Sequence, residues 1–391
     1  MTSCEKTNKS YISLIVLLIT IINMNLQNNL IGKKDYFYWL DAIRFIAAFM
    51  VLFSHSRNDF FLPWADLPLE DRGVGTFIFY TLGRLGHEAV IVFFVLSGFL
   101  VGGVGLKRIF SNNFNTSSYA IDRIVRILLP LISAIILFVF VSLLLGNPIS
   151  IITIIGNLFS LQGICVNSLV SPFWSLSYEV WFYIFIGSIG FIVSQKDYRS
   201  KFKGLILFSI VVTMFVCGLK AHYLLIWMMG AIAYLSRPQK FNKWIFLLSI
   251  IGFFFSVALG QMSSDSNSLT LMFKIGNKEF IDVIMSLFFC LFIQHIILVK
   301  PENKISCFIE TRLGKLACFS YTLYLCHRII FLPIYRYIYY DVGTYDISFI
   351  NILKWLSVVF MAMLGSYIIY LTAEKHTALV KKWLKRKLNI N

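Results

Sequence analysis

The chain has 391 residues, of which 58% are apolar and only 14% are charged, and its mean hydropathy is +0.77. Soluble globular proteins are about 45–50% apolar and about 25% charged, so a soluble enzyme, a disordered chain and a disulfide-rich secreted domain all fit poorly. The net charge of +16 would indicate nucleic-acid binding only with a basic face or a recognised binding module, and neither is evident. The seven cysteines form no CxxC pair and no metal-ligand spacing, so we expect no metal site. The composition predicts an integral membrane protein without a nucleic-acid partner.

Apolar segments of the length that crosses a bilayer, about 20 residues, recur along the chain. They predict an all-α fold, a polytopic transmembrane helix bundle of about ten spans. The expected spans are 37–56, 84–104, 124–146, 174–194, 204–219, 222–236, 243–260, 280–299, 317–338 and 350–373. The fifth and sixth are short, and a single re-entrant hairpin is the alternative for that pair. The apolar segment 149–164 is interrupted by Asn157 and Gln162, which predicts an interfacial helix or loop.

These spans define one transmembrane domain, residues 36–375, followed by a basic tail, residues 376–391. The preceding extension, residues 1–35, contains the short apolar run Ser13–Met24. This run resembles a signal-peptide core or a short hydrophobic helix, and Met24 as the true start is a third interpretation.

Lysine and arginine concentrate in the tail and in the loops on one side of the expected spans, whereas the opposite loops carry few. Cytoplasmic loops are enriched in these residues. We therefore expect both ends of the domain to be cytoplasmic, in a protein of the inner (plasma) membrane.

Ionisable residues within spans are costly and usually face the bundle interior. In the first span, Arg44 and His55 are eleven residues apart, close to three turns at about 3.6 residues per turn. They should share one helix face, about 16 Å apart along the axis, with the cation near the cytoplasm and the imidazole near the outer end. The alternative is a snorkelling arginine and a structural histidine.

Arg123 and Arg126 open the third span at i and i+3, so their guanidinium groups can converge on one cytoplasmic ligand. Arginine suits phosphate because its planar donor fork binds two oxygens together. The alternative is that the pair only sets the topology.

Further polar side chains enter other spans from the outer side. Glu179 lies inside the fourth span, with Trp174 before it, and could orient an imidazole or be the structural partner of an intramembrane arginine. His87 and Glu88 begin the second span at roughly the level of His55.

The ninth span has a polar stripe on an otherwise apolar helix. Ser320, Tyr324 and His327 follow one another at i, i+4 and i+7, so they share a face that should line a cavity. In the second span, Ser97 and Gly98 allow another helix or a ligand to approach closely, and helix packing is the favoured interpretation.

Together these motifs resemble acyltransferase family 3, integral membrane acyltransferases that modify sugars and cell-envelope glycans. The resemblance rests on five motifs in order: Arg44 and His55 in an LDxxRxxAAxxVxxxH type of opening, FFVLSGF at 93–99, RxxRxxxP at 123–130, WSLSYEVWFY at 174–183 and SYTLYLCH at 320–327. Such proteins often carry Glu-Arg/Lys-Pro after the last span. Here Glu374-Lys375-His376 lacks the proline, and we expect Glu374 to be solvated at the surface.

The resemblance implies an O-acyltransferase, usually an O-acetyltransferase. It would move the acyl group of cytoplasmic acyl-CoA, a co-substrate rather than a bound cofactor, to a hydroxyl of a cell-surface polysaccharide or lipid-linked glycan. Arg44, Arg123 and Arg126 would bind the phosphates of CoA, and His55 would be the general base, assisted by Arg44 and Glu179. The residues expected to bind the acceptor or to orient His55 are His87, Glu88, Trp174, Tyr324 and His327.

A membrane transporter or flippase of a glycan or acyl intermediate is the main alternative, because buried charges also mark transport paths. Its usual signature, inverted repeats with paired broken helices, is not visible in the sequence. A non-catalytic sensor or assembly partner is a third interpretation, which the full Arg, His and Glu set disfavours.

Overall fold

The long apolar helices of the protein coincide with the predicted spans. The computed structural model describes residues 37–263, 278–299, 308, 312, 314–340 and 342–390, and the expected N-terminal extension lies outside them. The matching helices are α2 (Tyr38–Phe60), α4 (Gly86–Ser97) continued by η3 (Gly98–Gly103) and α5 (Val104–Phe110), α6 (Thr116–Leu145), α8 (Phe173–Ser194), α9 (Tyr198–Cys217), α10 (Ala221–Leu235), α11 (Lys243–Ser263), α12 (Lys278–Ile296), α15 (Ser320–Tyr337) and α16 (Phe349–Thr372). The segments described contain nine helices long and apolar enough to cross a membrane, and α10, with 15 residues, is shorter. They contain no strand, so the predicted all-α helix bundle is confirmed.

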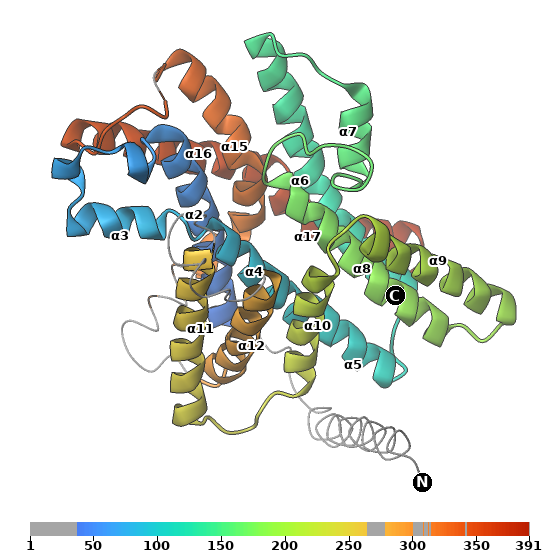
Figure 1. Cartoon of the computed structure of the whole chain (residues 1–391). Helices are drawn as coiled ribbons and strands as arrows, with labels where there is room; N and C mark the ends of the chain where they lie inside the picture. The colour runs from blue at the N-terminus through green and yellow to red at the C-terminus, as the bar shows by residue number, and fades with distance from the viewer. Residues whose placement is uncertain are drawn as a thin grey trace.

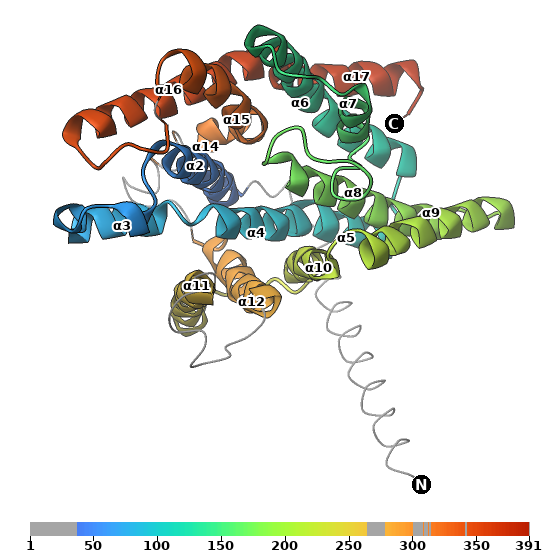
Figure 2. The same cartoon turned by 45° about the horizontal axis from the view of Figure 1, so that its top comes forward.

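The helices form two groups on either side of α4 (Figures 1 and 2). On one side α10, α11 and α12 pack together, and on the other side α2, α15 and α16 do so. α6 packs against α15 and α8, and α8 packs against α9. Because α4 contacts both α2 and α12, most of its side chains are buried.

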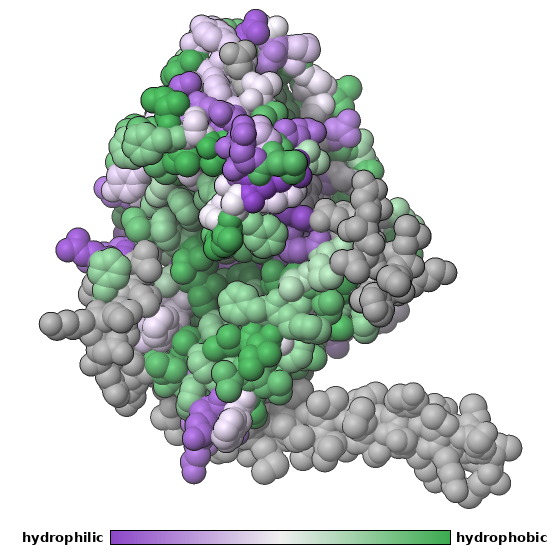
Figure 3. Space-filling model, turned by 60° about the vertical axis from the view of Figure 1, so that its left-hand side comes forward, coloured by the Kyte–Doolittle hydropathy of each residue, from purple (hydrophilic) through white to green (hydrophobic). Residues whose placement is uncertain are grey.

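Apolar side chains cover the outward faces of the helices. In Figure 3, hydrophobic residues gather across the middle of one face, and hydrophilic residues gather mainly toward its upper end. Phe140, Phe254 and Phe360, on α6, α11 and α16, are 63–65% exposed. An apolar surface of this extent is stable in lipid rather than in water, as expected of a multi-pass membrane protein.

Three shorter helices of eight residues or more lie in the described segments, together with the single turn α14 (Gly314–Leu316). α7 (Ile151–Leu158) lies in the predicted interfacial segment, and the polar residues that interrupt that segment are buried. Asn157 Nδ2 donates to the carbonyl oxygens of Thr153 and Asn167, both at 2.8 Å, and Gln162 Nε2 donates to Phe173 O at 2.9 Å. These bonds fix the loop that leads into α8. The other two helices, α3 (Val74–Leu82) and α17 (Thr377–Lys387), were not predicted.

The α4 and α10 backbones are in direct contact. A Cβ atom added to Gly98 would lie 1.9 Å from Trp227 O, and one added to Gly230 would lie 2.3 Å from Val95 O. Trp227 Nε1 donates to Ser97 Oγ at 3.1 Å. Glycine is therefore required at both crossing positions, and the predicted packing role of Ser97 and Gly98 is confirmed.

Gly98→Ala is expected to lower the free energy of unfolding by about 1–3 kcal/mol, the usual cost of overpacking, because its methyl group would collide with the Trp227 carbonyl. Gly75→Ala in α3 is the matched control, since a Cβ atom there meets nothing within 4 Å. Thermal denaturation of detergent-solubilised protein would compare both variants with the wild type. Equal midpoints for Gly98→Ala and the wild type would contradict this packing.

Candidate functional site

A polar cavity of about 410 Å³ lies among α2, α4, α6, α8, α15 and α17. Its charged lining consists of Arg44, Arg123, Arg126, Glu179 and Lys381. Its hydroxyl groups come from Ser97, Ser175, Tyr183, Ser320, Tyr321 and Tyr324. The three arginines predicted to bind the donor, which are separated by up to 82 positions in the chain, thus meet in one cavity.

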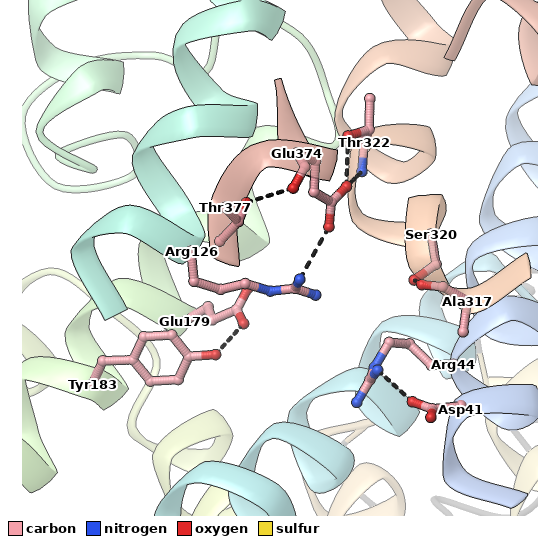
Figure 4. Close-up of polar contacts among 10 residues, drawn as sticks. All are labelled: Asp41, Arg44, Arg126, Glu179, Tyr183, Ala317, Ser320, Thr322, Glu374 and Thr377. Carbon is pink, nitrogen blue, oxygen red and sulfur yellow. Dashed lines mark hydrogen bonds and ion pairs between the residues drawn. The ribbon is translucent and has the colours of Figure 1, made fainter. Parts of the chain in front are cut away.

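Arg44 reaches this cavity from α2, with its guanidinium held by Asp41 one turn earlier (Figure 4). Arg44 Nη1 lies 2.8 Å from Asp41 Oδ1, and 24% of the Arg44 side chain is exposed. A guanidinium has five N–H donors, so this ion pair orients Arg44 and leaves donors for a ligand.

Arg126 is held by a carboxylate from the far end of the domain. Arg126 Nη1 lies 3.1 Å from Glu374 Oε1. The other carboxylate oxygen accepts bonds from Thr322 N at 3.2 Å and Thr322 Oγ1 at 2.6 Å (Figure 4). We call this set the Glu374 clasp, and it joins α6, α15 and the turn η6 (Glu374–His376).

The expectation that Glu374 is solvated at the surface was wrong. Only 4% of this residue is exposed, because the chain turns inward directly after α16. Thr377 Oγ1 also donates to Glu374 O at 2.6 Å, which stabilises the turn.

Arg123 is contacted by aromatic rings and forms no ion pair among the described residues. Its guanidinium carbon lies 5.5 Å from the ring centroid of Tyr183 and 5.8 Å from that of Tyr119. Cation–π contacts of this kind stabilise a cation without neutralising it. Among the described residues no carboxylate pairs with Arg123, so its charge is available to an anionic ligand.

Glu179 lies with the arginines and not with His55. It accepts a hydrogen bond from the Tyr183 hydroxyl (Figure 4), and it lies within electrostatic range of Arg126, Arg123 and Arg44. No contact joins Glu179 to His55 within the ranges described. This geometry matches the alternative interpretation, a partner for intramembrane arginines, better than the predicted orientation of the imidazole.

His55 instead contacts His327. The two rings are stacked, with centroids 5.4 Å apart and planes at 29°. His327 Nδ1 lies 2.9 Å from Leu323 O, and since a carbonyl oxygen only accepts, this nitrogen carries the proton. His327 Nε2 is buried without a partner among the described residues. The structure thus brings together the two histidines that the sequence placed on different spans.

Tyr324 connects these histidines to the cavity. It lines the cavity, its hydroxyl lies 2.6 Å from Ser175 Oγ, and its ring centroid is 6.3 Å from that of His327. The predicted stripe on α15 therefore lines the cavity through Ser320 and Tyr324, whereas His327 is fully buried beyond it. His55 is not part of the cavity lining.

An ion pair beside His55 was missed by the sequence analysis. Asp59, one helical turn after His55, pairs with Arg328, which follows His327. Side-chain exposures of 23% and 28% leave both groups accessible. The position of Asp59, four residues after His55, was the available signal that a polar group lies beside the imidazole. Its partner, Arg328, could not be predicted because it lies 269 positions from Asp59.

The remaining predicted acceptor residues lie elsewhere. His87 Nε2 is 2.9 Å from Asp282 Oδ2 on α12, and Glu88 Oε1 accepts a bond from Gln261 Nε2 on α11 at 2.6 Å. Trp174 packs in an aromatic cluster, with its centroid 5.6–6.2 Å from those of Phe94, Tyr178 and Tyr223. The structure does not bring any of these three residues into contact with His55.

Comparison with known proteins gives one match. A family model described as an acyltransferase domain matches residues 37–371, which includes α2 to α16 almost to its end. No curated protein and no solved structure matches the chain. The turn η6 and helix α17 lie beyond the matched residues.

Glu374→Ala is expected to lower the free energy of unfolding by about 1–3 kcal/mol, because it leaves the buried Thr322 donors without an acceptor. The loss of the ion pair adds to this cost only in part, since 35% of the Arg126 side chain is exposed and solvent screens an exposed charge. The exposed neighbour Lys375 supplies the control, Lys375→Ala. Thermal denaturation followed by size-exclusion chromatography would measure both, and a wild-type midpoint for Glu374→Ala would contradict the clasp.

Proposed function

The chain belongs to the acyltransferase domain family and is a membrane acyltransferase, and we propose that it is an O-acetyltransferase of a cell-surface or lipid-linked glycan. Acetyl-CoA from the cytoplasm is the proposed donor, and a sugar hydroxyl is the acceptor. The observation that carries this proposal is the single cavity that contains Arg44, Arg123 and Arg126.

The cation set suits the donor. Coenzyme A carries a diphosphate and a 3′-phosphate, and guanidinium groups bind such oxygens through paired, charge-assisted hydrogen bonds. Asp41 and Glu374 orient two of the guanidinium groups without occupying all their donors, and Arg123 has no acidic partner among the described residues. Three positioned cations support a phosphate-rich ligand better than a neutral one.

His55 is the proposed general base. Its imidazole would accept the proton of the acceptor hydroxyl while that oxygen attacks the thioester carbonyl. The new C–O bond forms, the C–S bond breaks, and the departing CoA thiolate takes the proton from the imidazolium. The stacked His327 restricts the His55 ring, and the accessible Asp59–Arg328 pair offers hydrogen-bonding groups to a sugar.

The side-chain contacts between the cavity and His55 support this assignment. Arg44 and His55 lie on one helix, and the rings of Tyr324 and His327 continue from the cavity to His55. The phosphates would therefore bind at the arginines while the extended arm of CoA carries the thioester toward the imidazole.

His55→Ala is expected to lower the rate of acetyl transfer at least about 100-fold, the lower range for loss of a general base. Membrane vesicles would be given acetyl-CoA with a labelled acetyl group, and label in extracted glycan would be counted. His376→Ala, at an exposed position in η6, is the control and should behave as the wild type. Wild-type transfer in a folded His55→Ala variant would exclude His55 as the base, and glycan movement without acetylation would favour the transporter alternative.

Arg123→Ala is expected to raise the KM for acetyl-CoA about tenfold, the effect of one lost charge-assisted contact, with a smaller change in kcat. This variant leaves no buried carboxylate unpaired, because Arg123 has no ion pair among the described residues. Arg108→Ala, at an exposed position of α5, is the control for loss of a cytoplasm-side charge. An unchanged KM in steady-state assays would exclude Arg123 from the donor site.

A further inference from the structure

The basic helix α17 (Thr377–Lys387) packs on the cavity but lies outside the residues that match the family. Its sequence, TALVKKWLKRK, carries five lysine or arginine residues in its last seven positions. The sequence predicted only a basic tail here.

Polar contacts at both ends attach α17 to α6 and η6. Lys385 Nζ lies 3.1 Å from Asp122 Oδ1 and donates to Ser118 Oγ at 2.7 Å, both in the first turns of α6. At the other end, the Thr377 hydroxyl bonds to Glu374 O, the backbone of the clasp residue. Figure 2 shows α17 beside α6 accordingly. The helix is therefore held at the end of the cavity where Arg123 and Arg126 lie.

Lys381 belongs to two hollows at once. It lines the polar cavity, and it also lines a shallow, open surface hollow on one face of α17. The other basic residues of that hollow are Lys382, Lys385 and Arg386. A cationic lining thus continues from the surface, through Lys381, to Arg123 and Arg126.

These cations exceed the acidic groups that neutralise them. Lys385 is paired with Asp122 and Arg126 with Glu374. Lys381 and Arg123 have no ion pair among the described residues. Lys381 lies within electrostatic range of Arg123 and also of Asp122, and Arg123 lies within range of Glu179. Like charges gathered in this way repel one another unless an anion binds between them.

We propose that the α17 hollow is an outer anion-binding site for the phosphates of the acyl-CoA donor, with Lys381 between it and the arginine site. This inference rests on the proposed function, and it adds a second position to the donor site. CoA carries phosphates at two separated places, so its recognition requires cations spread along a path. A lysine ammonium is a compact charge on a flexible stem and can follow such a phosphate into the cavity.

Anionic lipid headgroups present the same phosphate chemistry. Leu379, Trp383 and Leu388 are 55–66% exposed on this segment, and a basic helix with exposed apolar residues also binds membrane surfaces. The position of Lys381 in the inner cavity favours the donor, because a headgroup at the surface would need only the outer basic residues. The experiment therefore distinguishes binding of the CoA phosphates from binding of lipid headgroups.

The full chain would be placed in nanodiscs of zwitterionic lipid, and equilibrium binding of CoA and of 3′-dephospho-CoA would be measured. We expect the wild type to prefer CoA and Lys381→Ala to weaken CoA binding about tenfold, as for one charge-assisted contact. The same variant should reduce the preference for CoA over 3′-dephospho-CoA. Lys387→Ala, which removes a charge from the same helix but lines neither hollow, should bind CoA as the wild type does.

Equal CoA affinities for Lys381→Ala and the wild type would overturn this inference and leave the proposed function intact. Loss of retained anionic lipid from Lys381→Ala, without a change in CoA binding, would assign the hollow to lipid and also overturn it. A wild type that binds no CoA would instead refute the proposed function. Lys381→Gln, which keeps a side chain of similar length, provides the same test if the alanine variant is unstable.

Discussion

A guanidinium group in the hydrocarbon of a bilayer is costly unless protein groups replace its water. This constraint governs how Arg44, Arg123 and Arg126 are arranged. Asp41, one turn away, pairs with Arg44, and aromatic rings contact Arg123. Glu374, from the end of the domain, pairs with Arg126. None of these neighbouring groups uses all the N–H donors of a guanidinium. The contacts that stabilise the arginines therefore leave donors that can bind an anion.

The helices were predictable because the apolar length of a span is a local property of the sequence. The convergence of Arg44, Arg123 and Arg126 was predicted from their common side of the membrane and their residue type. The first inference needed no knowledge of helix faces, and the second used only the i, i+3 spacing of Arg123 and Arg126. The burial of Glu374 was not predictable, because it depends on Thr322 and Arg126, which lie 52 and 248 positions away.

The level of a residue along a span is easier to predict than the direction in which it points. His87 and Glu88 were predicted to lie at the level of His55. Because α4 is apolar on nearly every side, the periodicity of its sequence did not indicate which way these side chains point. The structure turns both residues toward α11 and α12. His327 was predicted better, since its polar stripe identified the face of α15. Helix α17 was missed because its attachment depends on Lys385 and Asp122, a tertiary contact with no local pattern.

The direct contact between α4 and α10 has a consequence for the surrounding lipid. With 15 residues at about 1.5 Å each, α10 is about 22 Å long, whereas a hydrocarbon core is about 30 Å thick. Gly98 and Gly230 bring the α10 backbone against that of α4 and η3, with no room for a side chain between them. Because α10 falls short of this thickness, local thinning of the bilayer or side chains that extend from the ends of the helix must make up the difference.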